Sequence, residues 1–118
     1  MIKSYKDLEV YQNSYSLALQ VHKMTKGYPE FERHEIGRQI RRSAISIPIN
    51  IAEGYRKKES IAEFKRFPRM SLGSCNETQV LIDMSKDLHY INEEAHHELW
   101  DGYEVLGKRI STLIAKWK

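Results

Sequence analysis

Apolar residues recur at intervals of three and four along most of this chain, which is the spacing of one face of an α-helix. The clearest example lies near the C-terminus, where steps of four, three, four, three and four residues connect Leu99, Tyr103, Leu106, Ile110, Leu113 and Trp117. No segment shows a competing strand pattern. The periodicity therefore predicts an all-α protein made of four long amphipathic helices.

Capping and helix-breaking residues predict where these helices begin and end. Ser4 is a suitable N-cap for the first helix, which should end at Gly27, just before a proline. The second helix should begin near residues 31–33 and run to Gly54. We expect a kink rather than a break at Pro48, because the apolar period continues unshifted past it.

The two remaining helices have clear N-terminal signals. Ser60 and Glu63 form the capping-box pattern that should start the third helix, which ends near Leu88. Asn92 is a plausible cap for the fourth helix. Four long helices joined by short loops predict one domain, residues 1–118, folded as an antiparallel up-and-down four-helix bundle.

The second helix is apolar over more of its circumference than a bundle requires. At about 100° per residue, its apolar residues between Ala44 and Ala52 cover roughly 200°, about twice the usual arc. The polar remainder is a narrow strip formed by Ser43, Ser46, Asn50 and Glu53. The surplus residues are Ile45 and Ile49, and we expect a second subunit to cover them. The alternative is that the neighbouring helices flank the second helix widely enough.

Three arginines precede these isoleucines on the same side of the helix. Arg41 and Arg42, with Arg38 one turn earlier, are expected to rim or enter the subunit interface, where arginine is favoured. The predicted interface thus contains Ile45, Ile49, Arg41 and Arg42. The arginines could equally line a groove for phosphate groups.

Charge is distributed unevenly along the chain. The net charge is +3, but residues 33–69 contain ten basic and four acidic residues, whereas residues 70–118 contain five basic and eight acidic. A basic middle region can attract polyanions, and Tyr55 beside it could stack on a base. A solvated loop and helix face is the alternative. The candidate phosphate contacts are Arg38, Arg41, Arg42, Arg56, Lys57, Lys58, Lys65, Arg66 and Arg69.

Residues suited to catalysis are sparse. Cys75 is the single cysteine and should be a small buried residue. Glu93, Glu94, His96 and His97 form Glu-x-x-His pairs, but on one helix only, whereas di-iron bundles need this motif on two. We therefore expect no enzyme, no metal site and no cofactor. The chain has no bilayer-spanning run and no signal-peptide core, so we expect a cytoplasmic protein without a membrane partner.

Residues 39–54, QIRRSAISIPINIAEG, resemble the signature of the four-helix bundle proteins encoded within intervening sequences of bacterial 23S ribosomal RNA genes, the S23 type. Residues 5–10, 63–67 and 72–77 are similar to other segments of that family. The resemblance implies a bundle that assembles as a ring, typically a homopentamer. It also implies kinship with the accessory subunit of diversity-generating retroelements, a basic pentameric barrel that engages nucleic acid and a reverse transcriptase.

This chain departs from the family pattern at Pro68, where the family usually has an aliphatic residue. We expect Pro68 to kink the third helix or to delay its regular start. Ser43 replaces the usual alanine, which is a smaller change.

We therefore expect a non-enzymatic, homo-oligomeric bundle that binds structured RNA or DNA through a basic surface, with little sequence specificity. One alternative is a protein-interaction scaffold whose arginines pair with acidic groups between subunits. Another is a metal-binding bundle that uses Glu93, Glu94, His96 and His97.

Overall fold

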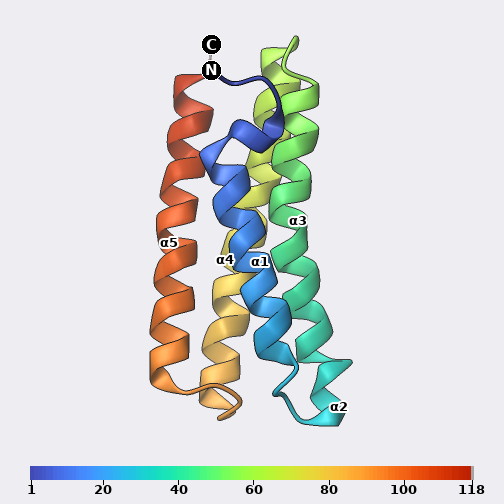
Figure 1. Ribbon diagram of the computed structural model, residues 1–118, viewed down its shortest axis with the longest axis vertical. Helices are drawn as coiled ribbons and strands as arrows, with labels where there is room; N and C mark the ends of the chain where they lie inside the picture. Colours follow the sequence, from blue (N-terminus) through green and yellow to red (C-terminus); the bar gives the residue numbers. More distant parts are fainter. Residues whose placement is uncertain (118) are drawn as a thin grey trace.

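The computed structural model describes residues 1–117, which are helical apart from short connections and contain no strand (Figure 1). Two short elements accompany the long helices, a 3-10 turn before the first and a one-turn helix before the second. In chain order the elements are η1 (Tyr5–Asp7), α1 (Glu9–Thr25), α2 (Glu30–Arg33), α3 (Ile36–Arg56), α4 (Ile61–Asp87) and α5 (Glu93–Lys116). The long helices run alternately down and up, which confirms the predicted four-helix bundle.

The N-terminal cap differs from the prediction. Ser4 caps η1 instead of α1, and the Asp7 carboxylate accepts hydrogen bonds from the backbone amides of Lys3 and Ser4 at 2.7 and 3.1 Å. Leu8 then adopts an extended conformation, so α1 begins only at Glu9. The reciprocal hydrogen bonds between Ser4 and Asp7 close one isolated turn before the helix starts.

The predicted second helix is divided into α2 and α3. The division falls at Glu35, whose backbone has φ −108° and ψ −99°, outside the helical region. Arg41 stabilises this break, because its guanidinium donates a 2.8 Å hydrogen bond to the carbonyl of Arg33 at the end of α2. The prediction of one continuous helix from residues 31–33 was therefore wrong at its start.

Both internal prolines lie within continuous helices. α3 continues past Pro48 without a break, as predicted. α4 begins at Ile61, where the Ser60 hydroxyl accepts a hydrogen bond from the Glu63 amide, so Pro68 does not delay the helix. Pro68 is buried, and its Cδ would lie 2.9 Å from a Cβ atom placed on Gly54. Helices α3 and α4 therefore approach each other closely at this glycine.

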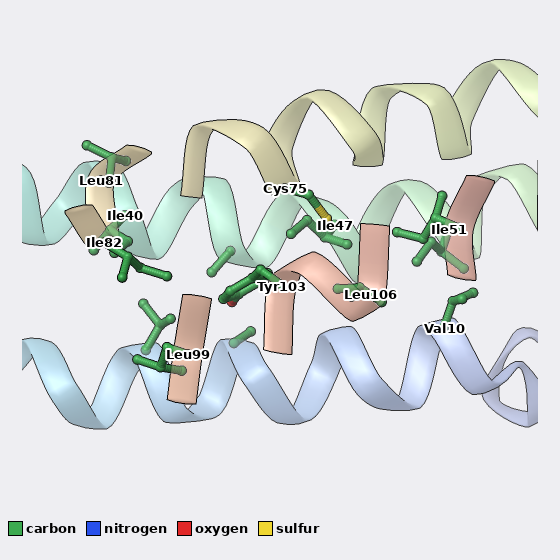
Figure 2. Packing of buried hydrophobic residues seen from close by; sticks show 14 of the residues in the cluster. Val10, Ile40, Ile47, Ile51, Cys75, Leu81, Ile82, Leu99, Tyr103 and Leu106 are labelled. Carbon is green, nitrogen blue, oxygen red and sulfur yellow. The ribbon is translucent and has the colours of Figure 1, made fainter. Parts of the chain in front are cut away.

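The hydrophobic core extends along the axis of the bundle (Figure 2). The predicted seam of α5 points into it, and Tyr103, Leu106 and Ile110 are almost completely buried. They meet isoleucines from α3 and α4 such as Ile47 and Ile82. Within residues 1–117, no helix has the combination of length and apolar character that a membrane-spanning segment requires.

The serines of the polar strip of α3 face α4 instead of solvent, whereas Glu53 of the same strip is exposed. Ser43 is buried, and its hydroxyl lies 2.8 Å from that of Thr78. The Ser71 hydroxyl donates to the carbonyl of Ile47 at 2.9 Å, and Ser46 bonds to Ser74. Small hydroxyl side chains with partners on the other helix let α3 and α4 pack closely without leaving polar groups unsatisfied.

Candidate nucleic-acid interface

The nine predicted phosphate contacts fall into two regions of the surface. Arg38, Arg41 and Arg42 lie in the first third of α3, beside α2. Arg56 lies at the end of α3, eighteen residues from Arg38, or about 27 Å along the helix. Lys57 and Lys58 follow in the turn, and Lys65, Arg66 and Arg69 lie on the first turns of α4.

Arg41 is committed to contacts within the chain. Its Nη1 donates to the Thr25 hydroxyl at the end of α1 at 3.0 Å, and its Nη2 donates to the carbonyl of Arg33 at 2.8 Å. The side chain thus joins α1, α2 and α3. Its guanidinium serves as a structural tie, which leaves little of it for a phosphate or a second subunit.

The basic residues around the turn between α3 and α4 mostly have aromatic or acidic neighbours. Arg66 pairs with Glu63 at 2.8 Å, and Lys57 lies 3.7 Å from Glu53. The other contacts are cation–π contacts with ring centroids: Arg56 over Tyr5 at 5.2 Å, Lys58 over Tyr55 at 4.1 Å, and Lys57 and Arg66 over Phe67 at 5.6 and 4.3 Å. These side chains are exposed, so their charges remain available to a polyanion.

Four of the nine residues have neither an acidic partner nor an aromatic one among the described residues. They are Arg38, Arg42, Lys65 and Arg69. Arg38 and Arg42 line a polar groove between α3 and α4, with a volume of about 670 Å³. The other lining residues are His34, Glu35, Gln39, Ser43, Ser46, Ser74 and Glu77. The groove therefore contains cations, hydroxyls and carboxylates together.

A second groove, between α1 and α3, is apolar and has a volume of about 460 Å³. Ile45 and Ile49 line it from α3, with 37% and 57% of their surface exposed. Leu19 lines it from α1 and is 58% exposed. The α1 side also contributes tyrosines: Tyr5 and Tyr11 pack edge to face at 4.9 Å, and Tyr15 follows at 5.9 Å from Tyr11. The neighbouring helices thus do not cover the two isoleucines.

The four predicted interface residues do not form one surface in the single chain. Ile45 and Ile49 belong to the apolar groove, Arg42 belongs to the polar groove, and Arg41 is turned inward.

A third surface was missed by the sequence reasoning. The outer side of α4 exposes Met70, Val80, Met84 and Leu88, which share one face of the helix. The available signal was the step of four residues that joins Val80, Met84 and the C-cap residue Leu88; on the same face, Gly73 and Glu77 separate Met70 from them. We call these four residues the α4 stripe. It faces away from α1, because α1 and α4 each pack against α3 and α5 and so occupy opposite corners of the bundle (Figure 1).

The histidines of α5 are engaged separately. His96 Nε2 lies 2.7 Å from a carboxylate oxygen of Asp83 on α4, whereas His97 Nε2 lies 3.1 Å from Asp101 on its own helix. Within residues 1–117, no three His, Cys, Asp or Glu side chains are placed to hold a metal ion together. The metal-binding alternative therefore gains no support from the geometry.

Burial raises the pKa values of three core side chains, Tyr28, Cys75 and Tyr103. Burial raises the pKa of the Cys75 thiol to about 12, so the group stays protonated and unreactive at neutral pH. Burial also raises the pKa of Tyr103, whose hydroxyl has no hydrogen-bond partner in the described part of the chain. Cys75 and Tyr103 lie in the hydrophobic core (Figure 2).

The fold and these surfaces define an antiparallel four-helix bundle with a basic side and exposed apolar surfaces, among them the apolar groove and the α4 stripe. Residues 6–112 match the family model described as 23S rRNA-intervening sequence protein. The chain therefore belongs to this family, which confirms the resemblance seen in the sequence.

The fold is also similar to a crystal structure at 1.70 Å of a protein with unknown function from the S23 ribosomal protein family, from Bacteroides thetaiotaomicron VPI-5482. The TM-score is 0.79 with 24% sequence identity, over 91% of this chain and 96% of that one. Among curated proteins the comparison finds no match. Neither similarity indicates a family of enzymes.

Proposed function

We propose that this chain forms a non-enzymatic homo-oligomer that binds structured RNA or DNA through its basic surface. The observation that carries the proposal is the set of unpaired cations on α3 and α4: Arg38, Arg42, Lys65 and Arg69 have no acidic partner within residues 1–117. Cations without intramolecular partners are free to replace the counterions of a phosphate backbone. Because these residues lie on helix sides and not on an element shaped to enter a groove, we expect little sequence specificity.

Two exposed apolar surfaces support self-association. The apolar groove lies between α1 and α3, whereas the α4 stripe lies at the opposite corner from α1. If the stripe of one copy occupies the groove of the next, the contact is head-to-tail, and such contacts close into rings when the rotation permits. A ring of five copies is the form that the family resemblance implies.

The charge distribution supports one basic end in such an assembly. Residues 74–104, the later part of α4 and the early part of α5, contain eight acidic residues and one basic residue. The turn between α3 and α4 lies at the other end of the molecule and contains Arg56, Lys57 and Lys58 (Figure 1). A polyanion would therefore be attracted most strongly to the turn end, and in the acidic half of the molecule only to the start of α3, where Arg38 and Arg42 lie.

A binding titration with labelled RNA and labelled duplex DNA, at about 50 and 200 mM salt, tests the proposal. We expect binding that weakens roughly tenfold or more across this range, since several counterions are released. Light scattering on the same sample gives the mass of the assembly. Absence of binding at the lower salt, from a well-defined oligomer, would exclude nucleic acid as the partner.

A charge-matched pair of variants makes the test more specific. Arg38→Gln with Arg42→Gln should weaken binding and reduce its salt dependence, whereas Lys23→Gln with Lys26→Gln removes the same charge at the end of α1. Equal loss in both double variants would mean that net charge alone, and not the α3 surface, determines affinity.

The protein-interaction scaffold remains a second candidate, and the α4 stripe is the observation that favours it. Four exposed apolar residues on one helix face suit a protein partner better than a nucleic acid. A monomeric mass, together with salt-independent capture of a partner protein by the intact stripe, would favour this candidate.

A further inference from the structure

The polar groove between α3 and α4 differs from the rest of the basic surface because most of its polar groups are unused. Among the described residues, Arg38, Gln39, Arg42 and Glu77 have no side-chain hydrogen bond or ion pair. The Ser46 and Ser74 hydroxyls bond to each other, and the Ser74 oxygen keeps a free lone pair. The groove therefore offers two guanidinium groups, an amide, a hydroxyl oxygen that can accept a hydrogen bond and a free carboxylate to a ligand.

Two of the four segments that carry the family resemblance meet in this groove. Residues 39–54 contribute Gln39, Arg42, Ser43 and Ser46 from α3, and residues 72–77 contribute Ser74 and Glu77 from α4. These segments are about thirty residues apart in the chain, and the antiparallel pairing of α3 and α4 brings them together.

The mixed charge of the lining limits which ligand fits. Arg38 and Arg42 are four residues apart, so they project from neighbouring turns of one wall and can share an anionic group. Glu35 and Glu77 would repel a phosphate placed close to them, so a bare phosphate backbone uses only part of the groove. A carboxylate opposite an arginine pair instead suits a ligand with an anion at one end and hydroxyl donors at the other.

We propose that this groove binds one ribonucleotide of an RNA strand, with its phosphate on Arg38 and Arg42 and its ribose hydroxyls on Glu77 and Ser74. A volume of about 670 Å³ is within the range of small-ligand sites and admits one nucleotide. The 2′-hydroxyl, both donor and acceptor, is the group by which a protein distinguishes RNA from DNA. The inference rests on the proposed function and narrows it to a preference for RNA.

The test compares an RNA oligonucleotide with a DNA oligonucleotide of the same sequence, both single-stranded, by fluorescence anisotropy on the intact protein. We expect the RNA to bind roughly tenfold more tightly, as one hydrogen bond to a charged group would give. Glu77→Gln and Ser74→Ala should reduce this ratio towards one. Glu77 is exposed and unpaired, so its replacement should leave the melting temperature unchanged.

The control is Lys65→Gln with Arg69→Gln, which removes unpaired charges outside the groove. We expect these changes to weaken RNA and DNA binding equally and to leave their ratio intact. Equal affinity for RNA and DNA in the unaltered protein, or an unchanged ratio in Glu77→Gln, would overturn the ribonucleotide site and leave the proposed function standing. Failure to bind either oligonucleotide would remove both.

Adenosine 5′-monophosphate and its 2′-deoxy form provide a second measurement. A single nucleotide tests the groove alone, because it has no neighbouring nucleotides that could bind elsewhere on the protein. In NMR titrations, we expect the ribonucleotide to shift the backbone amide signals of Ser74 and Glu77, and the deoxynucleotide to shift them less. Shifts confined to the turn between α3 and α4 would contradict the assignment.

Discussion

The two sides of α3 pack against their neighbouring helices in different ways. Towards α4, the helix presents serines and a glycine, and these are buried in close contact with Ser71, Thr78 and Pro68. Towards α1, it presents isoleucines and a proline, and part of this apolar surface remains open as a groove. On the α4 side, small polar residues of α3 are thus buried, whereas on the α1 side apolar residues of α3 are exposed.

Side-chain size explains this difference better than polarity does. Small hydroxyl groups allow the backbones of α3 and α4 to come close, and each hydroxyl finds a partner on one of the two helices. Between α1 and α3 the side chains are larger, and a groove remains in which Leu19, Ile45 and Ile49 stay exposed. The tight side stabilises the single chain, whereas the open side is available to another molecule.

The largest predicted effect concerns Gly54 on the tight side. A Cβ atom there would lie 2.8 Å from the carbonyl oxygen of Phe64 and 2.9 Å from Cδ of Pro68. The Phe64 carbonyl belongs to the backbone of α4 and Pro68 is a rigid ring, so neither can easily move aside. We expect Gly54→Ala to lower the free energy of unfolding by about 2–3 kcal/mol, measured in urea.

The matched control is Gly107→Ala in α5, where an added Cβ would meet no atom within 4 Å. This change should be neutral or stabilise the helix by up to about 1 kcal/mol. Similar effects at the two glycines would mean that the close approach of α3 and α4 is not what requires Gly54.

The neighbouring arginines extend the comparison to the surface. Arg41→Ala removes the hydrogen bonds to Thr25 and to the Arg33 carbonyl, so we expect a loss of about 2 kcal/mol in urea unfolding. Arg42→Ala removes no hydrogen bond or ion pair within residues 1–117 and should change stability by less than about 0.5 kcal/mol. Equal effects would contradict the division into a structural and a free arginine.

A smaller effect on the free energy of unfolding is predicted when the pH is raised. The pKa of Cys75 is raised to about 12 by burial, against an ordinary value of 9.0. The stability from keeping the thiol protonated is complete below pH 9 and is lost as the pH rises towards 12. We expect the free energy of unfolding to fall by about 1–2 kcal/mol between pH 8 and pH 10.5 through this group. Cys75→Ala, unfolded under the same conditions, should lack this part of the decrease; an identical decrease would show that other groups cause it.

Much of the fold was predictable from local signals. Two kinds of feature depend only on nearby residues, and the structure has both as predicted. They are the apolar seam from Leu99 to Ile110 and the helix caps at Ser60 and Asn92. The break at Glu35 was not predictable, because glutamate favours helix and the break is stabilised by Arg41, which lies on the next helix turns. The close contact at Gly54 likewise depends on a residue of another helix.

In the candidate sites too, features set by local sequence were predictable, and features set by contacts between helices were not. Periodicity identified Ile45 and Ile49 as surplus apolar residues, and both are exposed. Sequence alone could not separate Arg41 from Arg42, since their roles depend on which neighbours lie within reach. It also could not assemble the polar groove, because Ser74 and Glu77 come from a distant segment and approach Arg42 only through helix pairing.

A substitution on the side of α3 that faces α1 should barely change the stability of the single chain but should disrupt the assembly. Ile49 is 57% exposed in the single chain, so Ile49→Lys should alter the free energy of unfolding of the monomer by less than about 0.5 kcal/mol. If a second copy covers the groove, the same substitution buries an unpaired charge in the interface, and the assembly should dissociate.

Light scattering and sedimentation of the purified variant measure this outcome, with Val105→Lys on α5 as the control. Val105 is 47% exposed and lies outside both the apolar groove and the α4 stripe. We expect Val105→Lys to keep the mass of the unaltered protein and Ile49→Lys to lose it. Met84→Lys in the α4 stripe should then have the same effect as Ile49→Lys, because a head-to-tail contact needs both surfaces. An assembly that tolerates Met84→Lys but not Ile49→Lys would instead pair groove with groove, in a symmetric dimer.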